Sequence, residues 1–241
     1  MQITVSELLA HICSDQPHDL AGQLAEWMLA SSRFKAFVTT YRDKIRKKIR
    51  GARDAEGLRD LLLELETAYM LLQEARFTVE YEKYGLGKAR GPDFTVAFKV
   101  RILFNLEVTR LRAADGGVEQ RVADKQYAIS RFSDAVCGKL GQMLPGMINI
   151  LLVAPDGDRI ASDDVRMAMA DLKARAERKD AQFFSRKGFS GAPEFFRQFH
   201  QLSGIIVRGL SPWQADTRPI LWANAQAKQP IPPDLRTILQ K

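Results

Sequence analysis

A change in hydrophobic periodicity near residue 76 constrains the fold of this chain more strongly than any other feature. Residues 58–74 have the period of an amphipathic helix, in which four apolar residues share one line: Leu61, Leu65, Ala68 and Leu72. The period then becomes that of strands, rich in β-branched and aromatic residues, in three stretches: residues 77–81, 94–100 and 102–108. The pattern therefore predicts one long helix followed by three successive strands with short connections.

Two further elements complete the expected core. The sequence predicts a helix over residues 124–144 and a near-continuous apolar strand over residues 148–153, of the kind that is buried on both faces. An antiparallel meander, a crossover helix and a buried parallel strand form a compact α/β core. The expected order of elements is therefore α-β-β-β-α-β.

The segments on either side of this core are expected to add to it. The sequence predicts that residues 1–56 form a helical, basic N-terminal extension. Residues 57–241 are predicted to form the core with a C-terminal decoration. Within these two domains we also expect five helices and one strand, over residues 7–13, 20–30, 32–51, 163–179, 194–201 and 204–208. The proline-rich end, from residue 213, is expected to wrap around the core.

Composition excludes several classes of protein. The longest apolar stretch, residues 150–154, is about a quarter of the roughly 20 residues that a membrane-spanning helix needs. The N-terminus lacks the basic and apolar regions of a secretory signal. Cys13 and Cys137 cannot build a disulfide framework or a zinc site, and the three histidines are far apart in the sequence. We expect a soluble, cytoplasmic protein with no membrane partner.

The net charge of +7 is concentrated in one short segment. Residues 42–53 hold seven cations and one acid, and include Arg46, Lys47, Lys48 and Arg50. Such a cluster attracts polyanions, and nucleic acid is the first candidate. A solvated helix face and a docking site for an acidic protein are the alternative interpretations.

Two acidic residues lie where apolar residues dominate the neighbourhood. Asp93 begins the second predicted strand, and Glu107 lies near the end of the third. Counted outward from the turn between these strands, the two residues fall almost opposite one another, and adjacent strands lie about 4.8 Å apart. Two carboxylates this close repel each other unless a cation lies between them, and a hard divalent ion would supply it. Alternatively, Asp93 caps a turn and Glu107 pairs with a neighbouring arginine.

Three acidic positions, taken with the order of the elements, resemble a known superfamily. Glu64 on the long helix, Pro92-Asp93, and Glu107-Val108-Thr109 are similar to the motifs of the PD-(D/E)XK nucleases. The resemblance covers roughly residues 57–155 and implies a restriction-endonuclease-like fold. It also implies Mg²⁺ or Mn²⁺ held by three carboxylates and one backbone carbonyl, those of Glu64, Asp93, Glu107 and Val108. The implied activity is cleavage of phosphodiester bonds, in DNA rather than RNA, and the fold is compatible with a homodimer.

The sequence departs from this motif at Thr109, where the superfamily has a catalytic lysine. The lysine role can move to the following helix, which makes Lys125 and Lys139 candidates, with Gln142 close to Lys139. Lys139 also neighbours the apolar line of that helix, where a lysine can simply extend its charged end into solvent. If no lysine fills the role, the chain is a catalytically inactive nuclease-fold protein that binds nucleic acid or serves as an interaction module.

Overall fold

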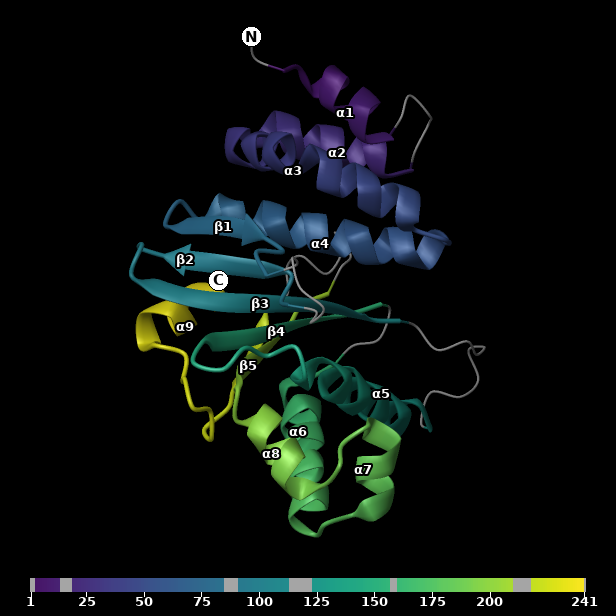
Figure 1. Cartoon of the computed structure of the whole chain (residues 1–241), viewed down its shortest axis with the longest axis vertical. Helices are drawn as coiled ribbons and strands as arrows, with labels where there is room; N and C mark the ends of the chain where they lie inside the picture. The colour runs from purple at the N-terminus through teal and green to yellow at the C-terminus, as the bar shows by residue number, and fades with distance from the viewer. Residues whose placement is uncertain are drawn as a thin grey trace. The chain divides into compact units, whose positions relative to one another are not determined.

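The computed structural model (Figure 1) describes most of the chain. The described ranges are residues 3–13, 19–84, 91–112, 123–156, 160–209 and 218–240. The chain forms two compact units, Met1–Tyr81 and Glu82–Lys241. This division differs from the predicted one after residue 56, since the long helix and the first strand belong to the first unit. Within the described ranges, the helices are too short or too polar to cross a bilayer.

The described residues of the first unit form four helices and one strand: α1 (Val5–Cys13), α2 (Asp19–Ala30), α3 (Ser32–Gly51), α4 (Ala55–Gln73) and β1 (Phe77–Tyr81). The predicted helices and strand of this region are all present. The helix α4 begins three residues earlier than predicted, because Asp54 acts as its N-cap and accepts a 2.7 Å hydrogen bond from the backbone N–H of Gly57. The cap satisfies a backbone donor that the first helical turn leaves without a partner.

An aromatic cluster and one arginine hold the first unit together. Trp27 stacks on Tyr69 with ring centroids 5.3 Å apart, and Phe34 meets Tyr69 edge-on at 5.5 Å. The guanidinium group of Arg33 on α3 donates to the backbone carbonyls of Leu72, Glu74 and Phe77. These bonds connect α3 to the end of α4 and the start of β1. The hydrogen bonds of Arg33 thus fix the start of β1 relative to α3 and α4.

The second unit is a mixed sheet with helices. The elements in its described ranges are β2 (Phe94–Phe98), β3 (Ile102–Leu111), α5 (Ala123–Leu140), β4 (Ile148–Pro155), α6 (Ser162–Glu177), α7 (Ala181–Lys187), α8 (Ala192–Phe199), β5 (Leu202–Val207), β6 (Ile220–Ala223) and α9 (Pro233–Leu239). Neighbouring strands follow the order β2-β3-β4-β5-β6. The pair β2·β3 is antiparallel, β3·β4 and β4·β5 are parallel, and β5·β6 is antiparallel. The predicted α/β class and the predicted α-β-β-β-α-β element order are confirmed.

Long-range pairing changes the predicted strand ends. The strand β3 continues to Leu111 because it pairs with β4 as far as Pro155. The strand β2 ends at Phe98, where the backbone turns. In the C-terminal segment, β6 pairs antiparallel with β5, so this part of the tail adds a strand to the sheet instead of only covering the core. The short helices α7 and α9 were also not predicted.

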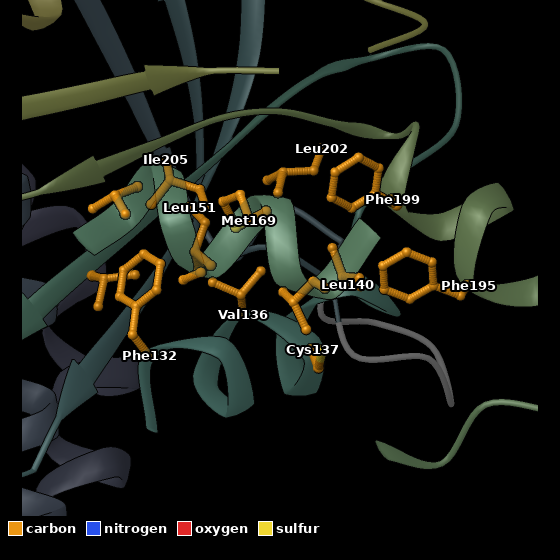
Figure 2. Packing of buried hydrophobic residues seen from close by; sticks show 14 of the residues in the cluster. Phe132, Val136, Cys137, Leu140, Leu151, Met169, Phe195, Phe199, Leu202 and Ile205 are labelled. Atoms are coloured by element: carbon orange, nitrogen blue, oxygen red, sulfur yellow. The ribbon is translucent and has the colours of Figure 1, made fainter. Parts of the chain in front are cut away.

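The main apolar core of the second unit lies between one face of the sheet and helices α5 to α8 (Figure 2). Phe132, Val136 and Leu140 of α5 are buried, as the predicted apolar line of this helix requires. Leu151 of β4 faces them from the sheet. Full burial of such a side chain contributes about 1.5–3 kcal/mol. Because Glu107 is the register partner of Leu151, its side chain also projects toward the helices.

The reactivity of the Cys137 thiol provides a test of this packing. Burial in α5 raises the pKa of Cys137 to about 12, so at pH 8 the thiolate fraction is on the order of 1 in 10,000. We expect Cys137 in a Cys13→Ser variant to react at least about 100-fold more slowly with a thiol reagent than in denaturant. Rapid reaction in the absence of denaturant would contradict the packing of α5 against the sheet.

Candidate functional site

Asp93 lies at the beginning of β2, immediately after the buried Pro92. Its Oδ2 atom accepts a 2.8 Å hydrogen bond from the backbone N–H of Val108 on β3. The register pairs Phe94 with Leu106, so one step further along the ladder places Asp93 opposite Glu107. The predicted opposition of the two acidic positions agrees with this register.

Glu82 is a second acidic residue beside Asp93, and the sequence analysis missed it. Its backbone N–H donates to the carbonyl of Asp93 at 2.7 Å. The two carboxyl groups each have an oxygen within 4.8 Å of the other. Glu82 also has a positive φ of 46°, which is uncommon for a residue with a side chain. Its position directly after a predicted strand was the only signal in the sequence.

Glu107 is buried, with 2% of its surface exposed, and α5 and the turn after it supply partners for its carboxylate. The Nζ atom of Lys139, in the last turn of α5, lies 2.5 Å from Oε1 of Glu107. The side-chain amide of Gln142, oriented with its nitrogen toward the carboxylate, donates to both oxygens, at 2.6 and 3.1 Å. A buried carboxylate requires such partners. Lys139 and Gln142, which were predicted to lie close together, therefore both contact the Glu107 carboxylate.

Thr109 is half-buried on β3, two residues beyond Glu107, and pairs in register with Val153. It provides a hydroxyl group but no charge. Lys139 brings the cation to Glu107 from the helix, as expected if the lysine role has moved. The other candidate, Lys125, has a side chain outside the described residues. Arg110, whose parity excludes it from the face of Glu107, forms an ion pair with Asp156 at 2.7 Å.

Glu64, in the first unit, has the partner that its place at the edge of an apolar face requires. Its Oε2 atom lies 2.5 Å from Nζ of Lys48 on α3 and accepts a hydrogen bond from the hydroxyl of Tyr81. The ammonium group of Lys48 also lies over the Tyr81 ring, 4.8 Å from its centroid. The carboxylate is thus held in a defined position within its own unit. The metal-binding role of Glu64 stays a prediction.

The basic cluster of α3 divides into two rows. Lys44 and Lys48, one turn apart, face β1, where Lys44 donates to the carbonyl of Tyr81 at 3.1 Å. Lys47 and Arg50 are exposed, and Arg46 is half-buried. Ile45, between these two rows, is fully buried. Of the four residues predicted to contact nucleic acid, Lys47 and Arg50 are therefore the most accessible, whereas Lys48 is paired with Glu64.

Comparison with protein-family models, curated proteins and solved structures found no match for this chain. The structure itself defines a mixed α/β protein with an acidic pair at the start of β2 and a buried lysine–glutamate pair between β3 and α5. The chemistry that this site can perform is therefore argued from these residues alone.

Proposed function

We propose that this protein is a divalent-metal-dependent nuclease of the PD-(D/E)XK type that cleaves phosphodiester bonds in DNA. The observation that carries the proposal is the 2.5 Å contact between Lys139 and Glu107, on the strand that pairs with β2 directly after Asp93. The antiparallel pair β2·β3, the helix α5 and the parallel strand β4 support it, because they have the topology that the resemblance implies. A restriction-endonuclease-like fold is part of the same proposal.

The donor atoms near Asp93 fit a hard divalent cation. Glu82 and Asp93 offer carboxylate oxygens close to one another, and Mg²⁺ and Mn²⁺ prefer oxygen ligands. When bound, such an ion would polarise a phosphoryl oxygen and lower the pKa of a water molecule. Asp93 is the ligand on which the proposal depends. The ligand roles of Glu64, Glu107 and the Val108 carbonyl stay predictions.

The remaining residues of the site have distinct proposed roles. Lys139 would stabilise the negative charge that develops on the phosphate during attack, a role that needs a positioned cation. Thr109 would donate a hydrogen bond to a phosphate oxygen or to the attacking water. The exposed cations Lys47 and Arg50 of α3 would bind the DNA backbone, which confers affinity without sequence recognition.

The test is cleavage of single-stranded, duplex and branched DNA with Mg²⁺ or Mn²⁺. We expect turnover that needs the metal and that falls at least about 100-fold in Asp93→Asn, because the amide is a poor ligand for a hard cation. The matched control is Asp163→Asn, a change at an exposed aspartate of α6, which is expected to leave the rate unchanged. Intact substrates under all of these conditions would contradict a nuclease function.

An inactive nuclease-fold protein that binds nucleic acid or serves as an interaction module is the second candidate. Two observations favour it: Thr109 stands at the lysine position, and the Glu107 carboxylate is already bonded to Lys139 and Gln142. This candidate predicts that the protein binds DNA in a salt-sensitive way without cleaving it, and that Asp93→Asn leaves the DNA affinity unchanged. Such a result would decide for this candidate.

A further inference from the structure

The turn between β2 and β3 has a backbone conformation that its residues disfavour. Lys99 and Val100 have positive φ values of 49° and 65°, and the N–H of Arg101 donates to the carbonyl of Phe98 at 3.2 Å. Two consecutive residues in the left-handed region form a type I′ turn, for which Asn-Gly is the preferred sequence. A β-branched residue such as Val100 is an outlier there. The turn therefore carries backbone strain that glycine would remove.

Burial of the Val100 side chain does not compensate for the stability that the strained backbone costs. Its surface is 87% exposed, and Leu103, just beyond the turn, is 47% exposed. Lys99 and Arg101 flank Val100 and are both exposed, so an apolar side chain projects between two cations. Lys99 forms a 3.4 Å ion pair with the exposed Asp234, and its ammonium group lies 5.1 Å from the centroid of the Phe98 ring. A strained residue that remains in solvent indicates a surface that is used.

The rest of the hairpin gives this tip a rigid support. Phe98, the residue before the turn, is fully buried and pairs in register with Ile102. The β2·β3 ladder continues unbroken from there to the pair of Phe94 with Leu106. Because the ladder also joins β4, a force on Val100 would act on the sheet of the second unit.

We propose that this hairpin tip, residues 98–103, is a wedge that inserts Val100 between base steps of duplex DNA. Proteins that distort DNA from the minor groove insert apolar side chains in this way and hold the adjacent phosphates with cations. Lys99 and Arg101 would bind the phosphates on either side. The inference shares with the proposed function only the choice of DNA as ligand, and it applies equally to a protein that binds DNA without cutting it.

The geometry of the strand also predicts where the distortion lies. Lys99 is six residues beyond Asp93 along β2, a distance of about 20 Å at about 3.3 Å per residue. On a duplex whose axis runs along β2, with base pairs about 3.4 Å apart, the distorted step would lie about six base pairs from the nucleotide nearest to Asp93. The wedge and the proposed metal site would thus contact different parts of one duplex.

The test is the variant Val100→Gly, because a wedge and a simple turn predict different effects of this change on DNA affinity and DNA bending. In both cases glycine relaxes the backbone, and the Tm is expected to rise by about 2–4 °C. If Val100 is a wedge, the affinity for duplex DNA should nevertheless fall by about fivefold or more, and DNA bending should be lost. Binding is measured by fluorescence anisotropy in EDTA, and bending by energy transfer between dyes on the two duplex ends, so cleavage does not enter either measurement.

Two further variants separate the wedge from charge and from turn geometry. Val100→Leu keeps an apolar side chain and should keep both affinity and bending, whereas Lys173→Gln, at an exposed lysine of α6, should change neither. If Val100→Gly raises the Tm and leaves affinity and bending unchanged, or if the wild type does not bind duplex DNA, the wedge is wrong. If binding depends on Val100 but no metal supports cleavage, the wedge stands and the nuclease proposal fails.

Discussion

Replacing Lys139 with methionine is expected to lower the single-turnover rate of metal-dependent DNA cleavage by about 100-fold or more. Methionine keeps most of the length and apolar character of the lysine side chain but removes the cation, which the structure places 2.5 Å from Oε1 of Glu107. Since Thr109 cannot supply a charge, β3 holds no substitute at the motif position. The rate is measured with protein in excess over DNA, so that weakened binding does not limit it.

The same variant has a structural effect that must be separated from the catalytic one. Removing Lys139 takes the cation away from the buried Glu107, while Gln142, in the turn after α5, can still donate to the carboxylate. Breaking such a pair costs about 3–5 kcal/mol of unfolding free energy. The double variant Glu107→Gln/Lys139→Met removes both charges and should recover most of this stability. Its cleavage rate should stay as low as that of the single variant.

Measurements of both stability and cleavage rate in the single and double variants therefore distinguish a catalytic from a structural role of Lys139. Recovery of both properties in the double variant would show that the pair is only structural. A full cleavage rate in Lys139→Met would contradict any catalytic role. The variant Lys173→Met, at an exposed lysine of α6, is the matched control and should change neither property.

The second large effect is expected at Asn149, which lies at the beginning of β4 and is 1% exposed. Its Nδ2 atom donates to the backbone carbonyls of Leu144, Met147 and Gln201, at 2.8, 3.0 and 3.0 Å. Its Oδ1 atom accepts from Asn105 on β3 and from the backbone N–H of Leu144, both at 3.2 Å. One side chain thus satisfies backbone groups of the adjacent residues 144–147 and of the distant Gln201, and also bonds to a side chain on β3.

Asn149→Leu keeps the branching of the side chain, adds volume and removes all of these bonds. Each buried polar group that loses its partner costs about 1–3 kcal/mol, so we expect a total loss of about 3–6 kcal/mol and a decrease in Tm of about 10 °C. Thermal unfolding and urea unfolding measure this loss. The control Gln73→Leu changes an exposed amide on α4 and should alter stability by less than about 0.5 kcal/mol. A small effect at Asn149 would mean that water replaces the lost bonds.

Local patterns in the sequence predicted the elements of the core. The apolar line of α4, the alternation in β2 and β3, and the continuous apolar residues of β4 depend only on neighbours within one element. The position of Asp93 opposite Glu107 was also predictable, because a short hairpin determines the register by counting. The strand β6 was missed because its four residues are stabilised by pairing with β5 and have little pattern of their own.

The sequence by itself thus determined the order of the elements, the α/β class and the register that places Asp93 across from Glu107, because periodicity and turn length are local properties. Only the tertiary structure decided which cation reaches Glu107, that Glu82 lies beside Asp93, and that Val100 is held in a strained turn. Side-chain contacts between elements depend on helix position, backbone dihedrals and rotamers, and these are determined by packing across the whole unit.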